Sequence, residues 1–338
     1  MIANLGINGF GRIGRYLLRL LADDDQLRIA AINARADNAT LAHLFKYDST
    51  YGIFKGEVSH DDKGLIINGR PVIVTNKRAN EWEWDRLGVD IAVETSGTIK
   101  SRASLAQHQA CGAKKVVVSA PCKDADLTVV MGVNHDKYTD GEHLVISAAS
   151  CTTNCLALVA KVLHETFGIR HGLMTTIHSY TMSQRILDGS HKDLRRGRAA
   201  GVSMIPTSTG AAKATGLVLP ELEGKLDGMA IRVPTPNVSL VDFTCELKRK
   251  TTAVMLNAAL KEAADGPLRV NMGYCDEPLV SIDHVGSTYG GVVDAISTCV
   301  TNGTMAKVIV WYDNEAGFTN QLVRLLRMVA QESPAARG

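Results

Sequence analysis

A glycine-rich turn near the start of the chain constrains the fold more than any other feature. Residues 4–8 predict a short buried strand, and residues 12–22 carry apolar side chains at helical spacing. Between them the chain reads Gly9-Phe10-Gly11-Arg12-Ile13-Gly14. After a strand and before a helix, these glycines permit a tight turn and the close approach of a pyrophosphate to the helix N-terminus. The turn therefore predicts a Rossmann-type dinucleotide-binding unit.

Further strand-like runs alternate with helical ones in the first half of the chain. Such a rhythm is typical of a doubly wound parallel sheet, in which ligands bind beyond the carboxyl ends of the strands. The candidate cofactor contacts that follow strands are Ser96, Gly97 and Ser119. The runs themselves are residues 28–33, 91–94, 116–119 and 129–133.

The end of the second strand bears on which dinucleotide is bound. An acid is expected there to hold the ribose 2′-hydroxyl, but the chain has Ala34 followed by Arg35. An acid would repel a 2′-phosphate, whereas a small residue followed by Arg would accept one. This favours NADP over NAD. The alternative is that Ala34 is neutral in this respect and Arg35 is an ordinary surface residue.

The segment Ser150-Cys151-Thr152-Thr153-Asn154-Cys155 lies where an apolar strand at residues 144–146 gives way to a helix. Cys151 is then expected at or near a helix N-terminus, where free N–H groups and the helix dipole favour a thiolate. A thiolate adds readily to the carbonyl carbon of an aldehyde. The alternative is a small buried cysteine, which is a common role of this residue.

Two residues of the second half could serve such a thiol. His178 follows a strand at residues 172–177 and could hold an imidazolium beside Cys151 and move protons, although a lone histidine is more often structural. Arg232 lies in an apolar strand at residues 229–233. Because an unpaired buried Arg is costly, Arg232 is expected to meet an anion.

The second half also contains a long basic segment, residues 180–203, that is either a solvated loop or a site for anionic groups. Residues 207–210 add hydroxyls before a helix expected from Ala211 onward, which suits an oxyanion. Several long strands predict a mostly antiparallel sheet with helices on one face. The spacing of apolar residues over 319–331 predicts an amphipathic helix that packs on a domain.

The bulk composition excludes several classes of protein. A chain of 338 residues with 45% hydrophobic residues can form two domains, and its net charge of +2 does not argue for a dedicated nucleic-acid partner or a membrane surface. No apolar run approaches the roughly 18 residues of a membrane span, and signal-peptide anatomy is missing. Seven cysteines without zinc spacing predict free thiols, a cytoplasmic location and no metal site.

Taken together, these motifs resemble phosphorylating glyceraldehyde-3-phosphate dehydrogenase over essentially the whole chain. The matching stretches are residues 8–15, 46–49, 150–155, 191–196, 209–214, 232–238 and 311–315. The resemblance implies an α/β protein with a Rossmann-type doubly wound parallel sheet at residues 1–150, completed by a C-terminal helix at residues 317–334. It implies an α+β catalytic domain with a mostly antiparallel sheet at residues 151–316, and a homotetramer.

The resemblance also implies a reaction and roles for single residues. Cys151 would be the nucleophile and His178 its acid/base partner in converting glyceraldehyde 3-phosphate and inorganic phosphate, reversibly, to 1,3-bisphosphoglycerate through a hemithioacetal and a thioester. Such an enzyme serves glycolysis or gluconeogenesis. Asn314 would fix the nicotinamide carboxamide. Thr181 and Arg232 would hold the substrate phosphate, and the attacking phosphate would be held by Ser150, Thr152, Thr209 and Gly210, with Arg196 serving the anion sites.

Departures from the common family pattern bear on the cofactor. Many NAD-using members carry Asp at the position of Ala34, and Leu-Pro where this chain has Gly189-Ser190. A Ser at position 190 resembles the photosynthetic NADP-using branch, where it helps to hold the 2′-phosphate. Lys77 and Arg78 could approach the same phosphate. The expectation is therefore that NADP is preferred and that NAD is also used.

Two alternatives to this function remain open from the sequence. One is a sister dehydrogenase that acts on erythrose 4-phosphate with the same Cys and His chemistry. The other is a non-catalytic protein that binds RNA in the dinucleotide groove, against which the near-neutral charge and few aromatic residues argue.

Overall fold

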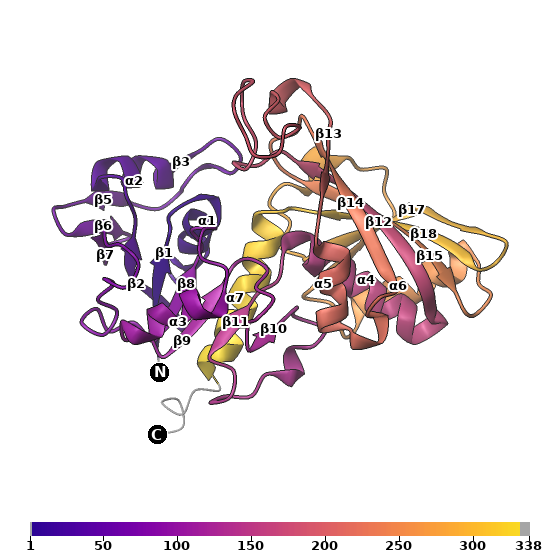
Figure 1. The fold of residues 1–338 in the computed structure, drawn as a ribbon, viewed down its shortest axis with the longest axis horizontal. Helices are drawn as coiled ribbons and strands as arrows, with labels where there is room; N and C mark the ends of the chain where they lie inside the picture. Colours follow the sequence, from indigo (N-terminus) through magenta and orange to yellow (C-terminus); the bar gives the residue numbers. More distant parts are fainter. Residues whose placement is uncertain (1, 332–338) are drawn as a thin grey trace. The chain divides into compact units, whose positions relative to one another are not determined.

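The computed structural model describes residues 2–331, which form two compact units (Figure 1). The first unit consists of the chain up to Val129, of His135–Ala149, and of the segment from Leu322 onward. The second unit consists of Val130–Asn134 and Ser150–Gln321.

The first unit is built on a nine-stranded sheet in the order β10-β11-β9-β8-β1-β2-β7-β6-β5. The strands from β10 to β7 pair in parallel, and β6 and β5 continue the sheet in antiparallel fashion. Every residue of β8, β9 and β11 is buried, as expected for a sheet covered on both faces. The strands are β1 (Ala3–Asn8), β2 (Leu27–Asn33), β5 (Val58–His60), β6 (Gly64–Ile67), β7 (Arg70–Thr75), β8 (Ile91–Glu94), β9 (Lys115–Val118), β10 (Leu127–Thr128) and β11 (Val145–Ser147).

The first three α-helices of the chain belong to this unit: α1 (Arg12–Leu21), α2 (Asn38–Lys46) and α3 (Arg102–Ala110). The strands β3 (Tyr47–Asp48) and β4 (Gly52–Ile53) form a small separate hairpin. A lack of space for a side chain at the turn between β1 and α1 explains two of the glycines. Gly9 has φ +96°, and a Cβ there would lie 2.6 Å from the backbone of Ser96. A Cβ on Gly14 would lie 2.4 Å from the carbonyl oxygen of Gly9. This strand–turn–helix and the parallel sheet around it confirm the predicted Rossmann-type architecture.

The strand predicted over residues 129–133 is wrong. The sheet strand ends at Thr128, and the following residues form a turn in which Val130 N–H donates to Asn134 Oδ1 and Val133 N–H to Val130 O. Gly132 has φ +86°, which a strand would not allow. The apolar run is therefore a buried turn whose polar backbone groups are satisfied locally, so burial imitates the strand pattern.

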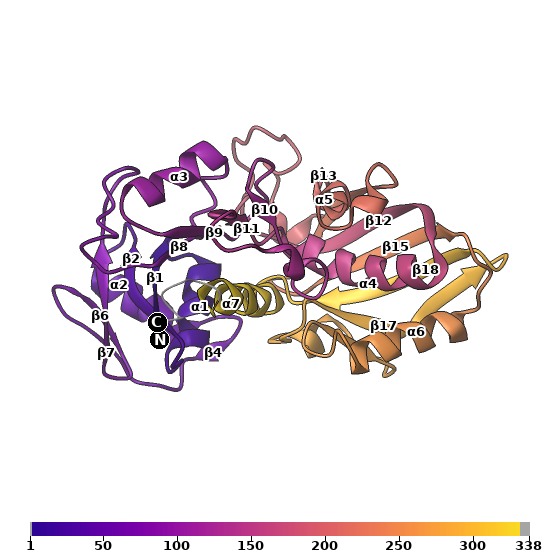
Figure 2. The same cartoon turned by 90° about the horizontal axis from the view of Figure 1, so that it is seen from below.

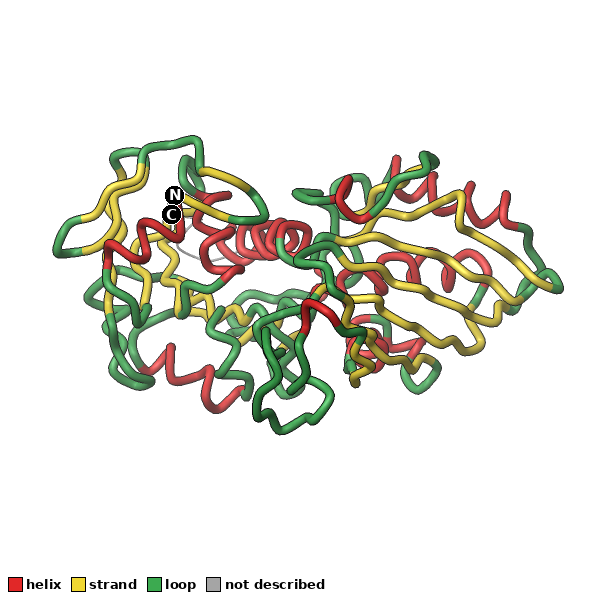
Figure 3. Tube along the Cα trace, turned by 90° about the horizontal axis from the view of Figure 1, so that it is seen from above, coloured by secondary structure: helices red, strands yellow, loops and turns green. Residues whose placement is uncertain are grey.

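The second unit contains a seven-stranded sheet in the order β13-β14-β12-β15-β18-β17-β16, seen as adjacent strands in Figure 3. Four of its six pairings are antiparallel and two are parallel, which confirms the mostly antiparallel sheet. Burial alternates along β15, and helices α4, α5 and α6 lie on one face of the sheet (Figure 2). The strands are β12 (Ile169–Ser179), β13 (Ile205–Ser208), β14 (Leu226–Val233), β15 (Ser239–Leu247), β16 (Met272–Cys275), β17 (Gly291–Thr301) and β18 (Met305–Tyr312), and the helices are α4 (Cys151–Phe167), α5 (Ala211–Val218) and α6 (Ala253–Asp265).

The last helix, α7, runs over Ala316–Gln331; residues 332–334 of the predicted helix lie outside the described residues. From Leu322 onward the helix belongs to the first unit, in which the Lys115 ammonium donates to the carbonyl of Val329 at 3.3 Å. Arg327 also pairs with Asp24 at 2.5 Å. Within residues 2–331, every helix is too short or too polar to cross a bilayer.

Candidate active site

The thiol of Cys151 sits at the first residue of α4. The helix begins there because the hydroxyl of Ser150 accepts a hydrogen bond from Thr153 N–H at 3.0 Å, which satisfies one of the free donors of the first turn. After Cys151, the residues from Thr152 to Ala160 are buried, and the helix packs against the sheet of the second unit. Packing thus fixes the direction of the helix and the position of the sulfur at its N-terminus.

The structure brings His178 and Arg232 to this sulfur from neighbouring strands. They are register partners in the parallel pair β12 and β14. Cys151 Sγ lies 3.6 Å from His178 Nε2. The other ring nitrogen, Nδ1, lies 2.7 Å from both Ser179 O and Arg232 Nη1, and that guanidinium also donates to Ser179 O at 2.9 Å. A thiol, an imidazole and a cation therefore form one contiguous group.

Burial sets the protonation of this group. Loss of solvation raises the pKa of Cys151 above its ordinary value, and the charge of Arg232 opposes that effect only in part. Burial and the same cation lower the pKa of His178 to about 3. The sequence predicts a thiolate favoured by the helix N-terminus and an imidazolium beside it. In the structure burial opposes both charged forms, because it raises the pKa of the thiol and lowers the pKa of the imidazole.

Arg232 is the group in this cluster best suited to an anion. Burial lowers the pKa of its guanidinium, and the nearby charge of Arg196 acts in the same direction. Its Nε is buried and has no hydrogen-bond partner among the described residues. Arg196 is held by Thr207 on β13, whose Oγ1 accepts from Nε and Nη2 at 2.9 and 2.8 Å. Two cations and an unsatisfied buried donor are an arrangement that a phosphate would complete.

The other candidate anion ligands form local bonds. Thr181 Oγ1 lies 2.8 Å from Ser183 Oγ, and Thr209 Oγ1 accepts from Ala211 N–H at 3.2 Å. Gly210 is the N-cap of α5 and provides no side-chain cap, so the first turn of that helix keeps donors for an anion. Within residues 2–331, the hydroxyls of Thr181 and Thr209 bond to Ser183 and to Ala211 N–H and not to the sulfur.

The sequence analysis missed Tyr312, which lies directly behind the reactive group. Its hydroxyl lies 2.8 Å from both Thr152 Oγ1 and Thr176 Oγ1, and its ring packs edge-on against His178 at 5.9 Å. Burial raises the pKa of the phenol well above its ordinary value, so it remains a neutral hydroxyl. At the end of the apolar strand β18 this residue looks like core in the sequence, and only its place in the motif 311–315 could have drawn attention to it.

The candidate cofactor residues of the first unit gather at the carboxyl ends of its parallel strands. Gly11 is the N-cap of α1 without a side-chain cap, and a Cβ there would meet no atom of the chain within 4 Å. Gly97, beyond β8, is equally open. Free helix donors beside open space fit a pyrophosphate. Around this space lie Ile13, which is half-buried, Ser119, which donates to Glu94 O, and Arg12, whose guanidinium is held by Asp48.

A buried polar network supports these strand ends. The carboxylate of Glu94 accepts from Ser96 N–H and from Asn8 Nδ2, each at 2.6 Å. His108 Nε2 lies 3.2 Å from the same carboxylate. The indole of Trp84 can only donate, and it donates to His108 Nδ1 at 3.0 Å, so Nε2 carries the proton that faces Glu94. Through the bond from Ser96 N–H to Glu94, this buried network fixes the loop that follows β8.

The region that would meet a 2′-phosphate is assembled by Asn33. Its side chain accepts from Lys77 N–H at 2.7 Å and donates to Lys77 O at 3.0 Å, so the loop after β7 lies against the end of β2. Ala34 there is 8% exposed, and Arg35 and Arg78 are exposed. Lys77 Nζ forms an ion pair with Glu83 at 3.1 Å. Glu81 accepts from Arg78 N–H at 3.3 Å, so the cluster is cationic but contains two competing carboxylates.

Two of the candidate cofactor residues, Ser190 and Asn314, lie in the second unit. Ser190 is exposed, and its carbonyl accepts from Arg185 at 2.9 and 3.1 Å. Asn314 is 8% exposed, and its Oδ1 accepts from Ser239 Oγ at 2.9 Å.

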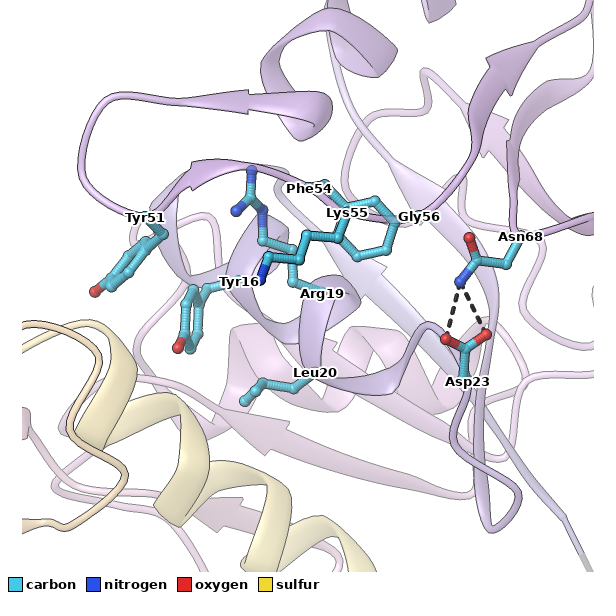
Figure 4. Close-up of a pocket in the computed structure, with 9 residues that line it drawn as sticks. All are labelled: Tyr16, Arg19, Leu20, Asp23, Tyr51, Phe54, Lys55, Gly56 and Asn68. Atoms are coloured by element: carbon cyan, nitrogen blue, oxygen red, sulfur yellow. Dashed lines mark hydrogen bonds between the residues drawn. The ribbon is translucent and has the colours of Figure 1, made fainter.

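A surface pocket of 560 Å³ in the first unit contains none of the candidate site residues. It is lined by Tyr16, Arg19, Asp23, Lys55 and their neighbours (Figure 4). The guanidinium of Arg19 is already committed to the carbonyls of Phe45, Lys46 and Gly52. This pocket lacks the thiol, the imidazole and the strand-end glycines, so the site described above is the candidate for chemistry.

A Rossmann-type unit, together with a second unit that carries a half-buried cysteine beside a buried histidine, defines the class of two-domain α/β dehydrogenases. Comparison with family models identifies the particular family. The glyceraldehyde 3-phosphate dehydrogenase NAD binding domain matches residues 3–102, and the C-terminal domain of the same family matches residues 150–314. The chain therefore belongs to the glyceraldehyde-3-phosphate dehydrogenase family.

Curated relatives agree with this assignment. The chain is 54% identical to glyceraldehyde-3-phosphate dehydrogenase of Geobacillus stearothermophilus, over 98% of this chain and 99% of the relative. It is 53% identical, with the same coverage, to glyceraldehyde-3-phosphate dehydrogenase 1 of Bacillus subtilis (strain 168). It is 46% identical to glyceraldehyde-3-phosphate dehydrogenase 2 of Trichormus variabilis, over 97% of this chain and 98% of the relative. These findings favour neither the erythrose 4-phosphate nor the RNA-binding alternative.

Proposed function

We propose that the protein catalyses the reversible oxidative phosphorylation of D-glyceraldehyde 3-phosphate to 1,3-bisphosphoglycerate with a nicotinamide dinucleotide. The observation that carries this proposal is the group formed by Cys151, His178 and Arg232, with 3.6 Å between Sγ and Nε2. Membership of the glyceraldehyde-3-phosphate dehydrogenase family supports the same reaction.

The neutral pair acts first as nucleophile and base. Cys151 Sγ adds to the aldehyde carbon while its proton passes to His178 Nε2, and the histidine returns this proton to the new oxygen to complete the hemithioacetal. The bound nicotinamide supplies a hydride acceptor. His178 takes the hydroxyl proton as the carbon–oxygen double bond of the thioester forms. Inorganic phosphate then attacks this carbonyl and the sulfur leaves, taking its proton back from His178, so the product is an acyl phosphate and the neutral pair is restored.

The anionic ends of the reactants require the cationic groups around the sulfur. We propose that Arg232 and Thr181 hold the substrate phosphate, since the buried Nε of Arg232 lacks a partner among the described residues. We propose that the attacking phosphate is held by donors at the N-termini of α4 and α5, with Arg196 nearby. The residues concerned are Ser150, Thr152, Thr209 and Gly210.

We propose that the cofactor is NADP in preference to NAD, with NAD also used. Ala34 offers no acid to repel a 2′-phosphate, and Lys77 and Arg78 offer charge. The pyrophosphate would lie over the Gly9–Gly14 turn, and the nicotinamide would meet Asn314.

Initial rates with both cofactors test the proposed reaction and the proposed cofactor preference together. A higher kcat/KM for NADP is expected, and an NAD preference would overturn the 2′-phosphate site without overturning the reaction. Absence of any phosphate-dependent oxidation would overturn the reaction.

We propose that residues 1–150 with the helix at 317–334 form the cofactor domain, that residues 151–316 form the catalytic domain, and that four copies assemble in the cytoplasm. Apolar side chains on the loop at residues 180–203 support assembly, because Met182, Ile186 and Leu194 are 84–90% exposed in the single chain. Ser190 on the same loop would complete a 2′-phosphate site. Light scattering on the purified protein tests the assembly, with a mass near four times 36.3 kDa expected.

A further inference from the structure

A strained residue interrupts the chain just before β15. Val238 has φ +64°, although a β-branched residue rarely adopts the left-handed region, and it is only 2% exposed. Such a conformation persists only where the surrounding contacts enforce it. The enforcing contact here is the hydroxyl of Ser179, which donates to Val238 O at 2.6 Å.

The residues on either side of Val238 hold two consecutive residues that follow β18. Asn237 Nδ2 donates to Asp313 Oδ2 at 2.8 Å. Ser239 Oγ donates to Asn314 Oδ1 at 2.9 Å. The strained backbone is therefore tied to the placement of Asp313 and Asn314.

The hydrogen bonds at Ser239 have a fixed direction. Ser179 N–H can only donate, and it donates to Ser239 Oγ at 3.1 Å. The single hydroxyl proton of Ser239 is then left for Asn314 Oδ1, which can only accept. Ser179, Ser239 and Asn314 are 0%, 2% and 8% exposed, so water has little access to these groups. With Oδ1 engaged, the amide nitrogen of Asn314 is the group left to donate to a ligand.

We propose that Ser239 is a positioning residue that sets the amide orientation of Asn314, so that Nδ2 donates to the carbonyl oxygen of the nicotinamide carboxamide. This inference rests on the proposed function, in which Asn314 binds that carboxamide. The same bonds begin at Ser179, the neighbour of His178, so the acid/base histidine and the carboxamide ligand share one support. Replacing the hydroxyl allows the amide of Asn314 to rotate and present an acceptor where a donor is needed.

The test compares two ligands of the whole protein. In Ser239→Ala, the dissociation constants of NAD and NADP should rise about threefold to tenfold, the effect of losing one oriented hydrogen bond. ADP-ribose lacks the nicotinamide ring, so its dissociation constant should equal that of the wild type. Calorimetric titration measures all three ligands and needs no catalysis.

A matched pair of variants guards against loss of folding. Ser239→Thr keeps the hydroxyl and Ser239→Val has nearly the same shape without it, so only the Val variant should lose affinity for NAD relative to ADP-ribose. An unchanged NAD affinity in both Ala and Val variants overturns the inference, and so does an equal loss for ADP-ribose, which would indicate a general structural role.

An analogue reports the orientation directly. The 3-acetylpyridine analogue of NAD keeps the carbonyl acceptor and lacks the amide N–H, so the wild type should bind it with an affinity close to that for NAD. Strong discrimination against it would mean that Asn314 accepts instead of donating, which overturns the inference. A wild-type protein that binds NAD in this way but fails to oxidise the aldehyde would overturn only the proposed function.

Discussion

The sulfur of Cys151 and the imidazole of His178 are the residues on which the proposed chemistry depends. Cys151→Ser should lower the rate of aldehyde oxidation by at least about a thousandfold, because a hydroxyl is far less acidic and less nucleophilic than a thiol. Cofactor binding should remain, because the strand-end glycines are untouched. Initial rates and a titration with NAD or NADP check both expectations.

Cys155 provides the matched control for that variant. It lies one helical turn further on, it is fully buried, and its pKa is raised well above the ordinary value. Cys155→Ala should therefore remain active while losing some stability through the small cavity it leaves. A fully active Cys151→Ser enzyme would contradict the mechanism.

His178→Asn should show whether the histidine serves proton transfer or substrate binding. Because Nε2 lies 3.6 Å from the sulfur, the ring is placed to take and return a proton there, and its loss should lower kcat about 10²–10⁴-fold. The KM for the aldehyde should change much less, since Arg232 remains. Steady-state and single-turnover kinetics check this split, and a KM effect without a kcat effect would assign His178 to binding alone.

Single residues show what the sequence could and could not reveal. Cys151, His178 and Arg232 could be named because each is chemically unusual for its predicted element. Tyr312 could not, because a tyrosine at the end of an apolar strand is indistinguishable from core. The raised pKa of the thiol could not be predicted either, because a helix N-terminus lowers that pKa while burial raises it, and only the structure gives the burial.

Helix α4 offers a prediction at the scale of the element. Ser150→Ala removes the N-cap and should lower the free energy of unfolding by about 1 kcal/mol. It should also raise the KM for inorganic phosphate, because the same hydroxyl is proposed to bind it. Urea denaturation and phosphate kinetics measure the two effects.

The N-cap of α3 gives the control for α4. Ser101 accepts from Ser104 N–H in an equivalent cap. Ser101→Ala should cost a similar free energy of unfolding and leave the KM for phosphate unchanged. Equal phosphate kinetics in the two variants would reduce Ser150 to a structural cap.

The end of β2 carries the prediction on cofactor choice. Ala34→Asp should lower kcat/KM for NADP by about tenfold or more and spare NAD, because a carboxylate repels the 2′-phosphate and accepts from a 2′-hydroxyl. Glu83→Gln should shift the ratio the other way, because it frees Lys77 from its ion pair. An unchanged NADP to NAD ratio in Ala34→Asp would show that no 2′-phosphate site forms there.

At the element scale the sequence predicted the helix after Cys151 and the strand at 91–94 correctly and failed at residues 129–133. The helix after Cys151 and the strand at 91–94 have the periodicity and flanks that their structures require. Residues 129–133 have the same apolar character as a buried strand, but local hydrogen bonds and Gly132 make them a turn. Burial, which the sequence reports, does not by itself specify backbone conformation.

The distribution of paired carboxylates over the whole molecule predicts a response to acid. Burial alone would raise the pKa of four aspartates in the first unit, but hydrogen bonds and ion pairs outweigh it and hold each pKa below the ordinary 3.8. A carboxylate with a lowered pKa stabilises the folded state above that value, and this stability is lost as the pH falls through the folded pKa. The residues and their partners are Asp24 with Arg327, Asp48 with Arg12, Asp126 with Arg102, and Asp140 with Lys115.

In the second unit, the aspartates with a lowered pKa are Asp188 and Asp193. Both lie on the loop at residues 180–203, so their ionisation contributes little to the stability of the rest of that unit. The first unit should therefore unfold first as the pH is lowered below about 4. Trp82 and Trp84 lie in the first unit and Trp311 in the second, so fluorescence of Trp311→Phe follows the first unit alone. Its transition should precede that of a Trp82→Phe, Trp84→Phe double variant, which reports on the second unit. Coincident transitions at every pH, or an earlier change at Trp311, would show that these ion pairs do not set the acid stability of the first unit.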